Sequence, residues 1–352
     1  MSVFFAILLF SVLILVHELG HFVAAKLSGV QVNEFSMFMG PAIWKKQIGE
    51  TLYAIRCIPI GGYCAMEGED GDSDNPRSFT QAAWWKRLII LAAGSAMNFL
   101  IGVLIMIAVY LPAQQVIAPV IDSFEAFSTV NGEDGLQVGD KFLEVDGEKI
   151  YAQSDFSLIL SMNPGDVHDL VVERRGEKVV LDDFRMEKHE VVSEDGTTRM
   201  LYGMNFSIVD MTIPDRIAYG WAQSLDTVRL VRLSLQMLVS GQAGLKDLTG
   251  PVGIVEQMSD VAASSATWLD ALLNMLYFGG FIAINLAVMN LLPIPALDGG
   301  RIAGLLLTTA IESVTRKKLN PKYEGYVHAA GMILLLGLMG IIMFKDIIGL
   351  FR

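Results

Sequence analysis

Four apolar stretches dominate this sequence, and each is long enough to cross a lipid bilayer as an α-helix. A crossing helix needs about 20 apolar residues, and the four stretches span residues 3–25, 88–111, 269–292 and 327–350. Hydrophobic residues make up 53% of the 352 residues and charged residues only 18%, far from the composition of an ordinary soluble protein. The sequence therefore predicts a polytopic α-helical membrane protein with about four transmembrane helices.

The first apolar stretch contains an ionisable cluster, His17-Glu18-Leu19-Gly20-His21. This interruption, with no basic residue ahead of the apolar run, favours a retained span over a cleaved signal peptide. On a helix, His17 and His21 lie on one face about one turn apart, so both imidazoles can reach one metal ion, and Glu18 can act on a metal-bound water. So short a pattern also arises by chance, but ionisable groups at the bilayer centre cost about 2.5–3.5 kcal/mol each. That cost favours a zinc site.

A second polar segment, Asn290-Leu291-Leu292-Pro293-Ile294-Pro295-Ala296-Leu297-Asp298-Gly299-Gly300, ends the third apolar stretch. A catalytic zinc usually has three protein ligands and one position for water, so one ligand must come from outside the first stretch. Asp298 offers a carboxylate oxygen, and the two glycines allow a close backbone approach. Taken alone, the segment also fits a turn whose aspartate caps the next helix. Beside the histidine motif, we favour the metal ligand.

Charge is distributed unevenly along the chain. Basic residues flank the apolar stretches at Lys26, at Lys86-Arg87 and between Arg316 and Lys322, which marks these ends as cytoplasmic. Residues 113–267, where acidic side chains outnumber basic ones roughly two to one, are then expected outside, as are both termini. This acidic region gives no indication of nucleic-acid binding.

Residues 30–68 alternate short β-prone runs with glycine and proline, which predicts β-hairpins. Two apolar triplets, Met37-Phe38-Met39 and Ile58-Pro59-Ile60, suggest that the region is associated with the membrane. A plain cytoplasmic loop fits these residues about equally well. Cys57 and Cys64 have no spacing typical of a disulfide framework or a cysteine zinc site, so we expect ordinary packed thiols.

The acidic region contains strand-like runs at 115–121, 141–145 and 170–173 and a helix-like run at 154–161. Within it, the string Gly135-Leu136-Gln137-Val138-Gly139-Asp140-Lys141-Phe142-Leu143-Glu144-Val145-Asp146-Gly147 resembles the signature of PDZ domains, and the resemblance covers about residues 116–188. We expect one extracytoplasmic PDZ-like α+β domain over 113–213, able to bind a peptide or a C-terminal carboxylate by strand addition. Residues 214–245 have apolar side chains at helical spacing. We expect region 214–267 to form amphipathic helices on the membrane surface, although helices packed on the soluble domain fit nearly as well.

The two polar motifs resemble those of the site-2 protease family of intramembrane metalloproteases, in particular its bacterial RseP-type members. HExxH in the first span and NxxPxPxLDGG in a later span are the family signature, and Gly94-Ser95-Ala96-Met97-Asn98 and Leu248-Thr249-Gly250-Pro251-Val252-Gly253 also look like family motifs. The resemblance implies that His17, His21 and Asp298 bind Zn²⁺, that Glu18 is the general base, and that Asn290 and Asn98 position substrate. Asn98 also fits a helix-to-helix hydrogen bond, and Asn290 also fits a cap for the broken backbone near the prolines.

The expected organisation is an N-terminal transmembrane half over 1–112 and a C-terminal transmembrane half over 268–352. The resemblance implies an intramembrane zinc metalloprotease of the bacterial inner membrane, with its zinc site toward the cytoplasmic side, that cleaves single-span membrane proteins such as anti-sigma factors or signal-peptide remnants. Many RseP-type members carry two PDZ domains, and one is recognisable here. The alternatives are a catalytically idle membrane chaperone or transporter that keeps the fold, and a surface zinc protease anchored by its spans.

Overall fold

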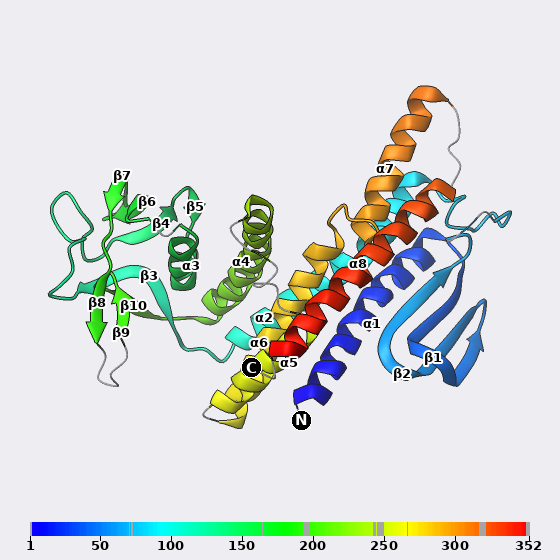
Figure 1. The fold of residues 1–352 in the computed structure, drawn as a ribbon, viewed down its shortest axis with the longest axis horizontal. Coiled ribbons are helices and arrows are strands. Elements are labelled where there is room, and N and C mark those ends of the chain that lie inside the picture. Colours follow the sequence, from blue (N-terminus) through cyan, green and yellow to red (C-terminus); the bar gives the residue numbers. More distant parts are fainter. Residues whose placement is uncertain are drawn as a thin grey trace. The chain divides into compact units, whose positions relative to one another are not determined.

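The computed structural model describes residues 2–69, 71, 73–163, 165–192, 198–241, 244, 250–265, 267–316 and 322–349. The chain forms two compact units, the first made of Met1–Met106 with Thr227–Arg352 and the second of Ile107–Asp226; Figure 1 labels their elements. The helices are α1 (Ser2–Ser28), α2 (Trp84–Tyr110), α3 (Gln153–Met162), α4 (Ile213–Ser240), α5 (Pro251–Ser264), α6 (Trp268–Asn290), α7 (Asp298–Thr315) and α8 (Lys322–Gly349). The strands are β1 (Val32–Ile48), β2 (Thr51–Met66), β3 (Gln115–Phe124), β4 (Lys141–Val145), β5 (Glu148–Lys149), β6 (Val167–Arg174), β7 (Glu177–Arg185), β8 (His189–Val192), β9 (Thr198–Leu201) and β10 (Met204–Asp210).

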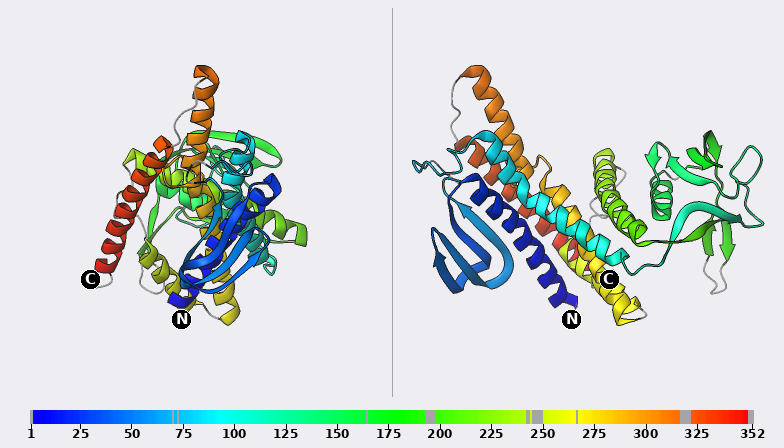
Figure 2. Two further views of the ribbon diagram at one scale, coloured as in Figure 1. Left: turned by 90° about the vertical axis from the view of Figure 1, so that its right-hand side faces the viewer. Right: turned by 180° about the vertical axis from the view of Figure 1, so that it is seen from behind.

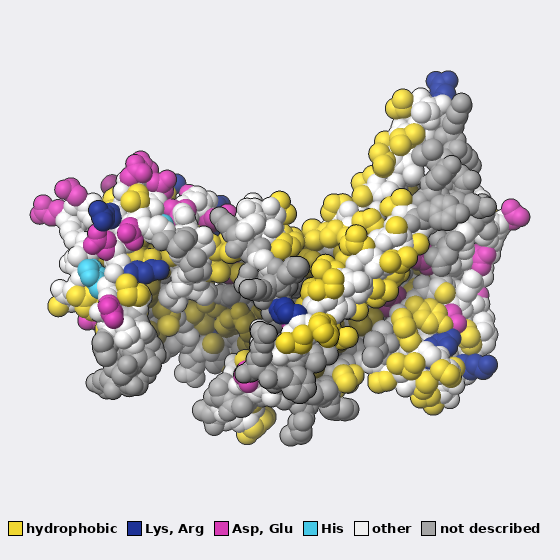
Figure 3. Space-filling view, in the orientation of Figure 1, with side chains coloured by type: hydrophobic (Ala, Val, Ile, Leu, Met, Phe, Trp, Pro, Cys, Tyr) yellow, Lys and Arg dark blue, Asp and Glu magenta, His cyan; other side chains and the backbone are white. Residues whose placement is uncertain are grey.

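Four of these helices are long and apolar enough to cross a membrane, which confirms the prediction from the sequence. The apolar segments are Ala6–Ser28, Trp84–Tyr110, Trp268–Asn290 and Ala329–Asp346. A helix suits hydrocarbon because it satisfies every backbone hydrogen bond within itself. Large apolar side chains accordingly point outward: Leu336 and Phe344 of α8 are 55% and 67% exposed, and Figure 3 shows hydrophobic side chains along the described surface of this helix. The chain is a multi-pass membrane protein.

Strands β1 and β2 form the expected β-hairpin, and each strand bends so that the hairpin has four paired segments. Residues 34–37 pair on one side with 52–55 and on the other with 62–65. The segment order across the sheet is therefore 62–66, 32–37, 51–56 and 42–48. Left-handed backbone at Gly40 (φ +84°) and Gly61 (φ +78°) allows the bends. Segment 62–66 consequently lies at one edge of this sheet.

The hairpin packs beside α1, mainly through β2, and both views in Figure 2 show the two elements next to each other. The Ser11 hydroxyl donates to the carbonyl of Pro59 at 3.1 Å, and a Cβ added to Gly62 would lie 3.8 Å from Cγ of Glu18. A buried cluster joins the end of α1 to the start of the hairpin, the start of α2 and Leu305 of α7; it includes Ala25, Val32 and Ile90. The hairpin is thus fixed next to the ionisable face of the first helix.

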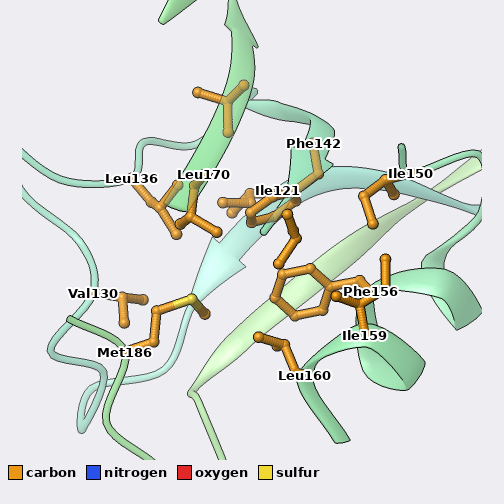
Figure 4. Close-up of a cluster of buried hydrophobic side chains, with 12 residues drawn as sticks. Ile121, Val130, Leu136, Phe142, Ile150, Phe156, Ile159, Leu160, Leu170 and Met186 are labelled. Carbon is orange, nitrogen blue, oxygen red and sulfur yellow. The ribbon is translucent and has the colours of Figure 1, made fainter. Parts of the chain in front are cut away.

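The second unit has its own core, between a sheet and helix α3. The strands follow the order β10-β3-β4-β6-β7, with β5 paired to β4, and all neighbours are antiparallel. Figure 4 shows the core side chains, among them Phe142 from β4, Phe156 from α3 and Leu170 from β6. The expected strands and the expected helix at 154–161 all fall within observed elements, which confirms these local predictions.

Two further expectations met different outcomes. The helical periodicity after residue 213 corresponds to one continuous helix, α4. Neither cysteine forms a disulfide, as expected, but only Cys64 is packed, whereas Cys57 is exposed. The prediction of a packed thiol was wrong for Cys57, because Cys64 lies in segment 62–66 and joins the buried cluster with α1, whereas Cys57 lies on the other side of the bend at Gly61, outside that cluster.

Candidate metal centre

The structure brings His17, His21 and Asp298 to one point. On α1 the two imidazoles lie edge to face, with their Nε2 atoms 3.1 Å apart. Asp298, the first residue of α7, places Oδ2 at 3.0 Å from Nε2 of His17 and at 3.3 Å from Nε2 of His21. Within the described part of the chain, these three residues form the one group of His, Cys, Asp or Glu side chains whose ligand atoms all lie close enough to share a metal ion.

Glycines let the helices approach closely enough to form this cluster. A Cβ on Gly94 of α2 would lie 2.5 Å from Nε2 of His21 and 2.8 Å from Nε2 of His17. A Cβ on Gly20 would lie 2.3 Å from the carbonyl oxygen of Ala93. Distances under 3.0 Å are not tolerated, so both residues must lack a side chain for α1 and α2 to pack as they do.

Glycines also position the third residue of the cluster. After α6 ends, the chain turns through Pro293–Leu297 before α7 begins at Asp298. A Cβ on Gly299 would lie 2.3 Å from backbone atoms of Leu291, and one on Gly300 would lie 2.3 Å from the carbonyl oxygen of Ile294. The first turn of α7 therefore packs directly on the end of α6, and this contact places Asp298.

The hydrogen bonds around the cluster leave lone pairs facing its centre. Nδ1 of His21 lies 2.8 Å from the carbonyl oxygen of Ile90 and must carry the proton, since a carbonyl only accepts. In the neutral imidazole, Nε2 of His21 is then the acceptor nitrogen, and it is directed at His17 and Asp298. Oδ2 of Asp298 is buried, and the two imidazoles are its only polar neighbours among the described residues. Acceptors that face one another in this way suit a shared cation.

The spacing of the three atoms fits zinc. Ligand atoms about 2.0–2.1 Å from a tetrahedral zinc stand roughly 3.3 Å from each other, close to the observed 3.0, 3.1 and 3.3 Å. Three protein ligands with an open fourth position are typical of a catalytic site. The backbone hydrogen bond to Nδ1 of His21 is the outer contact that usually orients a zinc-bound histidine.

The other predicted residues lie at different places around this cluster. Glu18 is half-buried, next to Gly62 of the hairpin edge, and interacts electrostatically with His17, His21 and Asp298. Asn98 of α2 is buried, with its amide nitrogen 3.5 Å from Nδ1 of His17. Asn290 is half-buried and is the last residue of α6.

Sequence reasoning missed the role of Gly94 and of the Ile90 carbonyl. Gly94 belongs to the motif Gly94-Ser95-Ala96-Met97-Asn98 of the second span, but the sequence does not show which side chains occupy the space that a Cβ at Gly94 would fill. A backbone carbonyl such as that of Ile90 leaves no signal in the sequence. The usable signal is a glycine, a serine and an asparagine close together in an otherwise apolar helix.

A cavity of about 580 Å³ lies within the second unit. Its lining includes Phe156 and Leu160 of α3 and Met204 and Phe206 of β10. Lys188 also lines the cavity. The cavity therefore combines an apolar interior with a strand, a helix and a cation at its wall.

Comparison with known proteins places the chain in a family. The sequence profile of peptidase family M50 matches residues 5–338. A Clostridium perfringens protein named as a zinc metalloprotease is 36% identical, with 99% of each chain covered. A Fusobacterium nucleatum protein with the same description is 31% identical, with 100% of each covered. The regulator of sigma-W protease RasP of Bacillus subtilis is 27% identical, with 98% of each covered. The cofactor of these enzymes is zinc, and this chain belongs to peptidase family M50 as a zinc metalloprotease of the site-2 type.

Proposed function

We propose that this protease cleaves transmembrane segments of membrane proteins, with His17, His21 and Asp298 holding zinc and Glu18 acting as general base. The observation that carries the proposal is that His17 and His21, on a helix apolar enough to span a membrane, meet Asp298 from the start of α7 with their ligand atoms close enough to share one metal ion. Polar groups at that depth are retained for a function because they are costly.

Glu18 is placed for proton transfer. When bound, zinc lowers the pKa of water toward about 7 and polarises a carbonyl group. Glu18 takes the proton of the attacking water and delivers it to the leaving amine, for which it must reach both sides of the scissile bond. Its position between the histidines and the hairpin edge is consistent with a substrate lying along that edge.

The hairpin edge offers a way to open the substrate. A transmembrane helix has its peptide groups bonded internally, so it must unwind before its backbone can be attacked. Segment 62–66 forms one edge of the hairpin sheet, and no further strand pairs with it in the described part of the chain. An unwound substrate added there as a strand regains hydrogen bonds. Proline at alternate positions of 62–66 should abolish cleavage of a membrane substrate, and unchanged cleavage would contradict this step.

Asn98 supports the metal ligand His17, and its assigned part in positioning substrate stays a prediction. Oδ1 of Asn98 is buried and has no partner among the described residues. Oxygen and nitrogen of an amide exchange by a half-turn of the group. In that orientation Oδ1 accepts the Nδ1 proton of His17 and frees Nε2 for zinc. The proposed role of Asn290 in positioning substrate rests on its place beside the turn that carries Asp298.

The second unit is proposed to be an extracytoplasmic PDZ-like domain over 113–213 that recognises peptides. The cavity between α3 and β10 suits an extended peptide added to β10, with an apolar side chain placed among Phe156, Leu160 and Phe206. Met200→Asp, which changes an exposed side chain that lines the cavity, should weaken binding of a peptide with an apolar C-terminal residue while zinc content stays unchanged. Deleting 116–188 separates recognition from exclusion: uncut substrates are accepted only if the domain serves as a barrier.

The basic flanks support placement in a bacterial inner membrane, with transmembrane halves over 1–112 and 268–352 and surface helices over 214–267. We propose single-span membrane proteins as substrates. Membrane-protein fragments from cells with wild-type or Glu18→Gln enzyme test this function. Fragments should be lost in Glu18→Gln while its zinc content stays normal. Biological function retained in Glu18→Gln would instead support the idle chaperone or transporter.

A further inference from the structure

We propose that the ion pair between Glu69 and Arg301 is a positioning device for the metal centre, which holds Asp298 in register with His17 and His21. Arg301 lies three residues after Asp298 on α7, so both side chains lie on one flank of the helix. Its guanidinium pairs with the carboxylate of Glu69. The two side chains are only 23% and 14% exposed. The inference rests on the proposed zinc ligands.

Glu69 belongs structurally to the half of the site that carries the histidines. It follows β2 directly, and its second carboxylate oxygen accepts from the backbone N–H of Met66 at 3.3 Å. Two residues earlier, the backbone carbonyl of Glu67 accepts from the backbone N–H of Phe79 at 2.7 Å. The backbone N–H of Glu67 donates to the carbonyl of Gln31 at 2.9 Å. These bonds tie the loop to Met66, the last residue of β2, and to Gln31, which directly precedes β1, and the hairpin packs against α1.

Arg301 has a second contact on the same loop. Its guanidinium lies 5.8 Å from the ring centroid of Phe79, and the guanidinium of Arg87 on α2 lies 5.1 Å from the same centroid. Phe79 is 3% exposed and belongs to the cluster that joins α1, the hairpin and α2. A planar guanidinium suits this arrangement because it pairs with a carboxylate while lying against a ring.

The pair therefore connects the two halves that must meet at the metal. His17 and His21 lie on α1, whereas Asp298 follows a turn in the C-terminal half of the chain that packs on the end of α6 and against Gly331 of α8. Ligand geometry must be held within a few tenths of an ångström for tight metal binding. A contact one turn from Asp298, anchored on the hairpin side, restrains the rotation and shift of α7 that would carry its carboxylate away.

Zinc affinity of the purified full-length protein in detergent tests the proposal, measured by competition with a chelator. Glu69→Gln and Arg301→Gln should each bind zinc roughly 10–100-fold more weakly, the usual range for outer contacts of metal ligands. The double variant should be no worse than either single one, because both changes remove the same contact. Glu50→Gln is the matched control: it removes a more exposed bridge to Lys26 and Arg77 and should leave zinc affinity unchanged.

Wild-type affinity in Glu69→Gln and Arg301→Gln, or losses that multiply in the double variant, would overturn the proposal. Should the glutamine variants not fold, Glu69→Asp decides: it keeps the charge but shortens the side chain by one methylene group and so withdraws the carboxylate from Arg301, and wild-type affinity there is equally contrary. His17→Gln distinguishes a failure of the positioning role from a failure of the zinc-ligand assignment. Zinc lost in His17→Gln but kept in Glu69→Gln refutes the positioning role alone, whereas zinc kept in His17→Gln refutes the ligand assignment itself.

Discussion

Apolar side chains of the second unit turn inward, onto a core that includes Phe142 and Leu170, both fully buried. In the first unit many turn outward, as Leu336 does, and polar side chains collect inside instead. The buried polar groups also differ. Asp140 in the second unit is fully paired, with Arg174 at 2.7 Å and the backbone N–H of Gln137 at 2.8 Å. Asp298 in the first unit faces two imidazoles and no other donor among the described residues. A buried carboxylate with a full set of hydrogen-bond and ion-pair partners stabilises the fold. A buried carboxylate without them is available to bind a cation.

Removing one carboxylate charge in each unit should have the largest effects, and the two effects should differ in kind. Asp298→Asn should abolish zinc retention and cleavage, because an amide is a poor replacement for a carboxylate ligand, and should leave the second unit folded. Asp140→Asn should keep zinc but destabilise the second unit by about 3 kcal/mol, since Arg174 loses its buried partner. Zinc content and hydrogen-exchange protection of each unit check both variants. Zinc loss in Asp140→Asn would show that the units do not divide these roles.

A lysine placed on the apolar surface of each unit should sharpen the comparison. Leu336 of α8 and Val180 of β7 are 55% and 54% exposed. Leu336→Lys should cost about 2.5–3.5 kcal/mol in membrane insertion, and Val180→Lys should stay within about 0.5 kcal/mol of wild type. The share of protein that resists alkaline extraction from membranes measures the first effect. Equal behaviour of the two variants would argue that Leu336 does not face lipid.

Gly94→Ala should have the next largest effect, on zinc rather than on folding. The new Cβ would lie 2.5–2.8 Å from atoms of both imidazoles, so the histidines must shift and zinc affinity should fall about 10–100-fold. Gly337→Ala in α8 is the control, because a Cβ there meets nothing within 4 Å. Chelator competition gives the measurement. Similar affinities in the two variants would mean that the histidines have more room than their packing indicates.

Much of this fold could be predicted from sequence because its signals are local. The apolar stretches, the hairpin and the strands around Phe142 follow from composition and periodicity over short windows. His17 and His21 could be paired from helical spacing alone, since both lie on one helix. Asp298 required a different argument, because its approach depends on how α6 and α7 pack.

The unpredicted features are those that depend on empty volume or on backbone atoms. Gly94 matters for the side chain it lacks, and Ile90 for its carbonyl oxygen. The bends of the hairpin, which bring segment 62–66 to the edge beside Glu18, arise from pairing of 34–37 on both sides. The sequence periodicity does not predict this double pairing, because each segment taken alone has the pattern of an ordinary strand.

The smallest expected effect concerns acid stability of the second unit. Burial raises the pKa of Asp146, but hydrogen bonds from His168, Asn163 and the backbone N–H of Asp169 outweigh burial and hold the pKa below its ordinary value. The ionised carboxylate therefore stabilises the fold fully above the ordinary pKa of about 3.9. This contribution is lost as the pH falls from there through the lower pKa of the folded state.

Hydrogen-exchange protection of the second unit, corrected for intrinsic rates, should accordingly fall as the pH drops below about 4. Asp146→Asn should be less protected than wild type at pH 6, and the difference should shrink in acid because protonation removes the same charge in the wild-type protein. Asp182→Asn, which changes an exposed carboxylate on β7, should follow the wild-type curve. A constant difference between Asp146→Asn and wild type at every pH would mean that the hydrogen bonds of Asp146 stabilise the unit by their geometry and not by its charge. Between Asp140 and Asp146, the charge that stabilises the second unit would then be that of Asp140 paired with Arg174, while the first unit would still need the carboxylate of Asp298 to hold a metal.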